Sequence, residues 1–196
     1  MAKIYCIVGA SCSGKDTIFK NLLNMDLGLT PIITYTTRPI RANENNGKEY
    51  YFVDRRIFSK LKHQGKVIEY RTYKTVHGDW TYFTVNDGQF DMKSNNKYIM
   101  INSLEGVSKL QKIYGKDVIV IHLVVNDRER LLRNLSREMS GNEDYTEMCR
   151  RFISDSKDFS VQNFNRLGIH DIRVENHSIP DCVQDIKNII KKNIVK

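Results

Sequence analysis

Short apolar runs recur along the chain and alternate with stretches of helical character. The runs cover residues 4–8, 98–101 and 118–125, and a weaker one covers residues 169–174. Apolar runs of about four to eight residues, bounded by turn residues, are typical of strands that are buried on both faces. Strands of this kind separated by helices are typical of βαβ units. The pattern therefore predicts an α/β fold of three layers, with a parallel sheet between helices.

Two helices carry clear sequence signals. A first helix is expected over residues 17–23, soon after the first strand. The last helix has a start signal at Ser178, because Asp181 follows three residues later and Pro180 falls in the first turn. We expect the apolar face of this helix to pack on the sheet. That face comprises Cys182, Ile186, Ile189 and Ile190.

Two segments interrupt the βαβ pattern. Residues 32–90 are rich in Tyr, Thr and Arg and contain turn signals such as Asn46-Gly47, which predicts an inserted, β-rich subdomain. A polar stretch, residues 136–145, breaks the helix that begins near Asp127 and predicts a short, movable cover. The expected organisation is one domain over residues 1–196, with a core (residues 1–31, 91–135 and 149–196), the subdomain (residues 32–90) and a lid (residues 136–148).

Charge and composition narrow the class of protein. The 196 residues carry a formal net charge of +8, which favours an anionic partner and fits a nucleotide, nucleic acid or a membrane surface equally well. The four cysteines form no C-x-x-C pair or His/Cys cluster at metal-ligand spacing, which argues against disulfides and zinc. No apolar run approaches the roughly 18 residues of a membrane span, and no signal-peptide or nucleic-acid-binding motif is present. We expect a cytoplasmic protein that binds neither membranes nor nucleic acid.

The segment after the first apolar run has the pattern G-x-x-x-x-G-K. A loop with glycines at both ends lets backbone N–H groups converge on the α- and β-phosphates of a nucleotide, and its lysine reaches the β- and γ-phosphates. The following helix adds its positive N-terminal end. The sequence therefore predicts a nucleoside triphosphate site formed by Gly9, Ala10, Ser11, Cys12, Ser13, Gly14, Lys15, Asp16 and Thr17.

One position departs from the usual loop. The residue after Lys15 is ordinarily Ser or Thr, whose hydroxyl ligates Mg²⁺, and here it is Asp16, with Thr17 next. In one interpretation the Asp16 carboxylate enters an altered magnesium shell. In the other, Asp16 is an acidic first-turn residue favoured by the helix dipole, and Thr17 serves the metal. Both readings remain open at this stage, with Mg²⁺ as the expected cofactor.

A second anion site is indicated by residues 34–41. Arg38 and Arg41 lie three residues apart in a stretch that Pro39 keeps from being an ordinary helix, and Tyr50 follows nearby. Guanidinium groups bind phosphate through two N–H donors, and a tyrosine hydroxyl adds a neutral donor. Beside a phosphate loop, these residues are candidates for a second phosphate.

Taken together, the motifs resemble those of guanylate kinases. The phosphate loop, T-x-T-T-R-P-x-R at 34–41, N-G-K-E-Y-Y-F-V at 46–53 and V-I-E-Y at 67–70 occur in the order and near the spacings of that family. The resemblance covers most of the chain, from residue 3 to about 193. It implies a P-loop NTPase fold and transfer of the γ-phosphoryl group of MgATP to GMP or dGMP.

The resemblance also implies an acceptor site. Arg38, Arg41 and Tyr50 correspond to residues that hold the phosphate of GMP. Tyr82 looks like the second tyrosine that does so, although residues 78–84 are one residue longer than the family's G-N-Y-Y-G-T segment.

Guanine itself is expected to meet Glu69 and Thr34. Guanine presents N1–H and its N2 amine side by side, so that one carboxylate accepts from both, whereas adenine cannot offer that pair. Glu69 matches the family's base-reading carboxylate, and Thr34 would reach O6. The family's I-L-D-x-D-x-x-G segment corresponds to residues 99–106, where both aspartates are absent. Ser103 is the remaining candidate there, and Asp16 would restore a carboxylate near Mg²⁺.

Three arginines resemble the lid arginines of the family: Arg133, Arg137 and Arg151. The choice between Arg151 and its neighbour Arg150 stays open. Cations that meet the charge on a moving phosphoryl group supply much of the acceleration in phosphoryl transfer. The alternative is that these arginines pair with glutamates at helical spacing. Asn176, after the last strand, sits where the family contacts adenine.

Two other functions remain compatible with the sequence. The missing aspartates would suit a kinase of the same fold with another phosphorylated acceptor. A catalytically silent, guanylate-kinase-like binding module is the second alternative, although the intact glycine loop and Lys15 argue against it.

Overall fold

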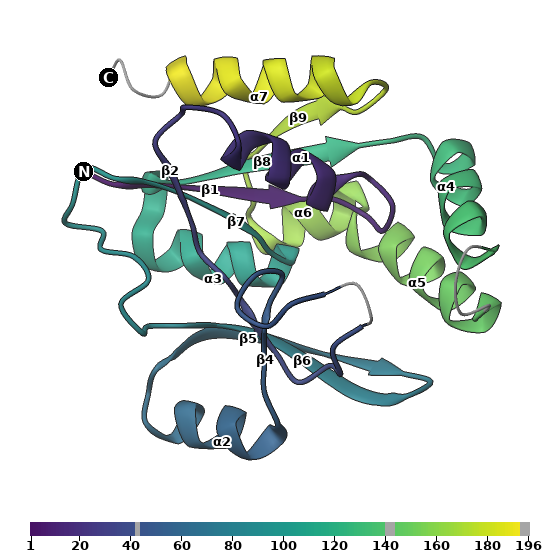
Figure 1. The fold of residues 1–196 in the computed structure, drawn as a ribbon, viewed down its shortest axis with the longest axis horizontal. Helices are drawn as coiled ribbons and strands as arrows, with labels where there is room; N and C mark the ends of the chain where they lie inside the picture. The colour runs from purple at the N-terminus through teal and green to yellow at the C-terminus, as the bar shows by residue number, and fades with distance from the viewer. Residues whose placement is uncertain (42–43, 140–143, 193–196) are drawn as a thin grey trace.

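A five-stranded parallel sheet forms the centre of the protein. The computed structural model describes residues 1–41, 44–139 and 144–192. The strand order is β2-β7-β1-β8-β9 (Figure 1). Each neighbouring pair is parallel, and β1 lies in the middle with β7 and β8 beside it. The strands are β1 (Lys3–Val8), β2 (Leu29–Pro31), β7 (Lys97–Ile101), β8 (Val118–Val124) and β9 (Asp171–Glu175).

The sheet confirms the predicted α/β class and the positions of its long strands. The last strand begins at Asp171, two residues after the predicted start at Ile169. Ile169 instead closes the turn after helix α6 (Val161–Leu167), since its N–H donates to the carbonyl oxygen of Phe164 at 3.2 Å. Its side chain is buried in the core, which explains why it extended the apolar run.

Helices cover both faces of the sheet, because β1 directs apolar side chains to each face in turn. Ile4, Cys6 and Val8 belong to one core cluster, which packs under α3 (Leu104–Tyr114) and α6. Tyr5 and Ile7 belong to the other cluster, under α1 (Lys15–Leu23) and α7 (Ile179–Lys192). Because successive side chains of a strand point to opposite faces, a fully apolar strand needs a cover on each side.

The closing helix α7 begins where the sequence indicates. The carbonyl oxygen of Ser178 accepts from the N–H of Cys182 at 3.0 Å, and its hydroxyl accepts from the N–H of Asp181 at 3.4 Å. The predicted apolar face is buried at Cys182, Ile186 and Ile190, and half-buried at Ile189.

A second sheet is inserted between β2 and β7. Its strand order is β4-β3-β6-β5, and the long strands β5 and β6 form an antiparallel hairpin. In Figure 1 this sheet and helix α2 lie below the parallel sheet. The insertion falls within the segment predicted to be β-rich. Its elements are β3 (Tyr35–Thr36), β4 (Tyr51–Phe52), α2 (Arg55–His63), β5 (Val67–Thr75) and β6 (Gly78–Val85).

Two helices, α4 (Asp127–Met139) and α5 (Tyr145–Asp158), lie side by side at the end of the parallel sheet where β8 leads into α4 (Figure 1). The helix predicted to break at 136 continues to Met139. Residues 140–143 of the predicted polar cover (residues 136–145) lie outside the described residues. Asp144 caps α5, because its carboxylate accepts from the N–H of Glu147 at 2.9 Å. A short 3₁₀ helix, Gly115–Asp117, completes the element list. No helix within the described ranges is long and apolar enough to cross a membrane.

Candidate functional site

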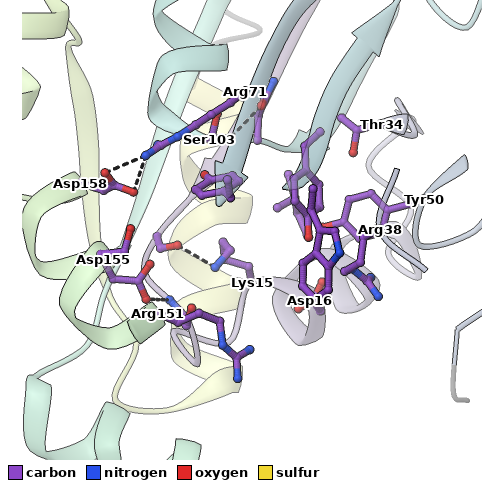
Figure 2. Close-up of a pocket in the computed structure, with 18 of the residues that line it drawn as sticks. Lys15, Asp16, Thr34, Arg38, Tyr50, Arg71, Ser103, Arg151, Asp155 and Asp158 are labelled. Carbon is purple, nitrogen blue, oxygen red and sulfur yellow. Dashed lines mark hydrogen bonds and ion pairs between the residues drawn. The ribbon is translucent and has the colours of Figure 1, made fainter. Parts of the chain in front are cut away.

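A cavity of about 420 Å³ opens where the parallel strands end and the second sheet begins. Figure 2 shows Lys15 between two walls. One wall carries Thr34, Arg38 and Tyr50 from the inserted segment, and the other carries Asp155 and Asp158 from α5. Crevices at the carboxyl ends of parallel strands are the usual place for ligands in open α/β sheets.

The phosphate loop lies between β1 and α1, and its glycines have no room for a side chain. A Cβ at Gly9 would lie 2.8 Å from the carbonyl oxygen of Leu123. Gly14 is the N-cap of α1 with a φ of 89°, and a Cβ there would lie 2.5 Å from Nδ2 of Asn176. Both positions therefore require glycine, which explains why the motif carries glycine at its two ends.

Lys15 is folded into the loop. Its Nζ donates to the carbonyl oxygens of Gly9 at 2.7 Å and Ala10 at 2.9 Å. Burial lowers the pKa of Lys15, and the carboxylates of Asp16 and Asp155 oppose that shift. The ammonium group thus sits at the floor of the cavity, within reach of a phosphate bound above the loop.

Asn176 and Arg133 brace the loop from behind. The side chain of Asn176 is fully buried, and its Nδ2 donates to the carbonyl oxygen of Ser13 at 2.8 Å. Arg133 donates to the carbonyl oxygen of Cys12 at 3.3 Å and forms an ion pair with Glu129. The adenine contact of Asn176 and the lid role of Arg133 stay predictions. The side chain of Arg137 lies outside the described residues.

Asp16 and Thr17 differ in their relation to the cavity. Both are exposed on the first turn of α1, and Asp16 lines the cavity next to Lys15. The described residues contain no group of three or more His, Cys, Asp or Glu suited to holding a metal ion. Magnesium at kinase sites is held by one or two carboxylates together with nucleotide phosphates and water, and the Asp16 carboxylate that lines this cavity fits such a donor set.

The structure brings the four candidate residues of the second anion site to one wall. Arg38 is only 4% exposed, and its Nη2 donates to Oε1 of Glu44 at 2.7 Å. The Arg38 guanidinium lies 5.7 Å from the centroid of the Tyr50 ring, which meets the Tyr82 ring at 5.6 Å. Arg41 is exposed and lines the same cavity. Burial raises the pKa of Tyr50, so its hydroxyl remains a hydrogen-bond donor.

Glu69 on β5 is only 3% exposed and lies behind the cavity lining, where it is hydrogen-bonded to the lining residue Asn102. Its Oε1 accepts from Oγ1 of Thr84 at 2.6 Å and from Nδ2 of Asn102 at 3.1 Å. Burial raises its pKa. A Cβ at Gly106 would lie 2.7 Å from Oε2 of Glu69, so α3 approaches this carboxylate closely only because it carries glycine there.

Thr34 and Ser103 both line the cavity. Thr34 is 8% exposed, and Ser103 is half-buried. The hydroxyl of Ser103 accepts from the N–H of Gly106 at 3.2 Å and so caps α3. Their contacts with a base stay predictions.

Helix α5 presents two arginines to the cavity. Arg150 makes two hydrogen bonds of 2.7 Å to the carboxylate of Glu147. Nε of Arg151 donates to the carbonyl oxygen of Glu147 at 3.4 Å. Both arginines line the cavity, so Arg150 joins the predicted Arg151 as a candidate cation.

Sequence reasoning missed three charged residues of the cavity wall. Arg71 on β5 makes two hydrogen bonds of 2.9 Å to the carboxylate of Asp158 and an ion pair with Glu105. Asp155 accepts from the N–H of Ser11 at 2.7 Å. Helical spacing from Arg151 could have found both aspartates, since residues four and seven positions along a helix share a face.

The family model, the relatives and the solved structure that this chain resembles all belong to the same family. The family model "Guanylate kinase" matches residues 1–193. The guanylate kinase of Wigglesworthia glossinidia brevipalpis is 31% identical over 95% of this chain and 86% of its own length. That of Nitrosomonas europaea is 26% identical over 100% of this chain and 92% of its own. The crystal structure of guanylate kinase from Anaplasma phagocytophilum has the same fold, with a TM-score of 0.75 at 21% identity, covering 100% of this chain and 87% of that one.

Proposed function

This chain belongs to the guanylate kinase family, whose members phosphorylate GMP with ATP, and we propose that its central cavity is where that transfer takes place. The products are ADP and GDP, and dGMP is a second acceptor. The observation that supports this assignment is the pairing of two different anion sites across one cavity. The phosphate loop lies on one side, and Arg38, Arg41, Tyr50 and Tyr82 lie on the other. Asn102, which also lines the cavity, donates a hydrogen bond to buried Glu69.

The donor triphosphate is assigned to the loop of residues 9–17. Its backbone N–H groups and the N-terminus of α1 favour negative charge, and Lys15 supplies a cation at the same place. Asn176 keeps the loop in shape through its bond to Ser13. A loop that is braced before the ligand arrives loses little entropy on binding.

The acceptor phosphate is assigned to Arg38, Arg41, Tyr50 and Tyr82. The Arg38 side chain is held by Glu44 and packed against the Tyr50 ring, so its guanidinium is already oriented. Arginine forks and tyrosine hydroxyls together satisfy several phosphate oxygens at once.

The guanine base is assigned to Glu69, with Thr34 and Ser103 beside it. Oε1 of Glu69 is fixed by Thr84 and Asn102, which orients the whole carboxylate. A carboxylate held in this way accepts from N1–H and the N2 amine of guanine. Adenine leaves it unpaired, and an unpaired buried carboxylate raises the penalty for the wrong base.

Phosphoryl transfer requires that the two substrates are aligned and that positive charge surrounds the transferred group. Lys15 on the donor side and Arg150 or Arg151 from α5 lie around the same cavity, where they meet the negative charge of the moving phosphoryl group. In characterised GTPases, an arginine in this role raises kcat by about 10³–10⁵-fold. Arg133 and Arg137 are proposed to complete this set from α4.

A magnesium ion is part of the proposal, bound together with ATP. Asp16 fits as its protein ligand better than Thr17, because the Asp16 carboxylate lines the cavity beside Lys15. When bound, Mg²⁺ offsets charge on the donor phosphates. The proposal also includes the organisation of the chain into a core, an acceptor subdomain (residues 32–90) and a lid (residues 136–148). It includes a cytoplasmic location, and it includes no nucleic-acid or membrane partner.

The test is ADP release from MgATP by the purified chain, with GMP, dGMP, AMP, CMP and UMP offered separately. We expect turnover with GMP and dGMP only. Lys15→Ala should lower kcat by at least about 10²-fold, as loss of a transition-state cation or donor does. Lys191→Ala, which removes an exposed lysine from the end of α7, is the matched control and should keep full activity.

Two results would contradict the proposal. Selective turnover of another monophosphate would indicate a related kinase with a different acceptor. Measurable ATP binding with no turnover of any of the five would indicate a silent binding module.

A further inference from the structure

A carboxylate of this chain occupies part of the phosphate loop. Oδ2 of Asp155, from α5, accepts a hydrogen bond of 2.7 Å from the backbone N–H of Ser11. Figure 2 shows Asp155 directed toward the loop, close to Lys15. Backbone N–H groups of such a loop are the donors that cradle nucleotide phosphates. A carboxylate oxygen and a phosphate oxygen make equivalent acceptors, so both use the same kind of donor.

Arg130 on α4 holds this carboxylate in place. Its Nη2 lies 3.4 Å from Oδ2 of Asp155, its Nε donates to the carbonyl oxygen of Ser11 at 3.3 Å, and its Nη1 bonds Asp127 at 2.9 Å. Arg130 is only 5% exposed and stacks over the ring of Phe152, 4.7 Å from its centroid. One buried arginine thus joins α4, α5 and the loop, so the position of Asp155 is built into the packing.

Asp155 also contributes charge to the donor site. It lines the same cavity as Lys15 and Asp16, and its negative charge acts on the Lys15 ammonium. A triphosphate bound to the loop would bring several negative charges close to this carboxylate. Like charges brought together in a partly buried site cost free energy, and the cost grows as water is excluded.

We propose that Asp155 is a further residue of the donor site, which competes with the phosphates of ATP for the Ser11 N–H and so sets ATP affinity. ATP binding then requires the Asp155 carboxylate to leave the loop, and α5 moves with it. The same helix carries Arg150 and Arg151, so release of Asp155 is coupled to the placement of these cations. This inference rests on the proposed donor site at residues 9–17.

The experiment measures ATP binding to the full chain without GMP, by titration calorimetry, in EDTA and again with Mg²⁺. Asp155→Asn keeps the size of the side chain and removes its charge. We expect it to tighten ATP and pyrophosphate binding by about tenfold or more, since like-charge contacts of this kind cost more than 1.4 kcal/mol. Adenosine, which has no phosphate, should bind unchanged.

Asp185→Asn is the matched control, because it removes one carboxylate from the exposed side of α7 and changes net charge equally. It should leave ATP affinity as it is. Asp155→Ala provides a second variant without a hydrogen-bond acceptor, and thermal unfolding of each variant checks that it is folded.

Weaker MgATP binding by Asp155→Asn would overturn the proposal and make Asp155 a metal or loop ligand. Unchanged ATP affinity would overturn it as well. Both readouts are independent of catalysis, so a chain that binds ATP but fails to phosphorylate GMP would contradict the proposed function and leave this test intact.

Discussion

Glu69 illustrates how a single residue combines burial with a defined orientation. Its Oε1 accepts both hydrogen bonds, from Thr84 and Asn102, while Oε2 faces the backbone of Gly106. An ionised carboxylate has about four acceptor positions, so these two bonds leave capacity for a ligand. Fixing the group beforehand makes its later pairing with a base more selective.

The first residue-scale prediction concerns Glu69→Gln. A glutamine replaces one acceptor oxygen by an NH₂ group, which opposes the N1–H and N2 donors of guanine. A lost bidentate contact costs about 1–3 kcal/mol, so kcat/KM for GMP should fall by about 5–150-fold. Turnover of AMP should stay near its original low value, so the ratio of the two measures base selectivity.

Two checks accompany that prediction. The Glu69→Gln and parent chains should have similar unfolding midpoints, which separates base recognition from a loss of folding. An unchanged preference for GMP over AMP would show that Glu69 does not read the base, whatever the fold.

Residues that are contiguous in the sequence were the easiest to predict. The loop from Gly9 to Thr17 is such a case, because its chemistry depends on its own backbone and on the glycines at its ends. Asp155 was missed because its role comes from packing between α5 and the loop, across 144 residues of sequence. Helical spacing from Arg151 could have placed Asp155 on the cavity side of α5, but no local signal pairs it with Ser11.

At the scale of elements, Arg71 connects three parts of the molecule. It extends from β5, pairs with Glu105 on α3 and makes its two bonds to Asp158 on α5. Its guanidinium also lies 4.4 Å from the centroid of the Tyr73 ring. The side chains of Arg71 and Asp158 are 19% and 17% exposed, so the pair is partly shielded from solvent. This contact ties the second sheet to the helix that carries Arg150 and Arg151.

We predict that the Arg71–Asp158 contact aligns the acceptor and the α5 cations. Arg71→Ala and Asp158→Asn should each lower kcat by about tenfold or more, because small displacements of aligned groups reduce rate strongly. The kcat of the double variant should be only slightly lower than that of the less active single variant. A double-mutant cycle on kcat then gives a coupling energy on the order of 1 kcal/mol.

Direct binding separates alignment from simple structural loss. GMP affinity, measured by calorimetry without ATP, should change less than kcat in both variants. Additive losses in the cycle would show that the two residues act independently.

The long elements could be predicted, and the shortest ones could not. Strands β1, β7 and β8 show as apolar runs because both of their faces are covered by helices. Strands β3 and β4 have only two residues each, too few for any period to appear. Helix α4 continued past the predicted break because its backbone bonds are local, whereas polar residues such as Ser136 disfavour a helix only weakly.

The stability of the whole protein depends on His122, a buried titratable group in the central sheet. It is 7% exposed, its ring stacks on Phe159 and Phe164 at 5.3 and 4.9 Å, and its Nδ1 lies 2.9 Å from Oδ2 of Asp171. Burial lowers its pKa below the ordinary 6.5, although Asp171 opposes that shift. Protonation therefore favours the unfolded chain.

The consequence is a pH-dependent stability. Below pH 6.5 the unfolded chain binds a proton that the folded chain still excludes, so stability falls as pH drops toward the lowered pKa of His122. Above pH 6.5 this contribution is constant. The loss amounts to about 1.4 kcal/mol for each unit by which the pKa falls.

Urea unfolding between pH 7.5 and 5 measures this effect. His122→Asn should show a shallower loss of stability in that range than the parent chain. His63→Asn, which changes an exposed histidine of α2, is the control and should keep the parent slope. Parallel slopes for His122→Asn and the parent would exclude His122 as the source.

The position of β1 in the middle of the sheet affects how the chain folds during its synthesis on the ribosome. β1 is synthesised well before its partners β7 and β8, which begin at Lys97 and Val118. Pairings between segments this distant close large loops and form slowly. The apolar residues 4–8 therefore emerge about a hundred residues before their neighbours exist, and they must stay unpaired during that interval. At a synthesis rate of roughly 5–20 residues per second, the interval lasts about 5–20 s, during which the unpaired apolar strand makes the nascent chain prone to aggregation.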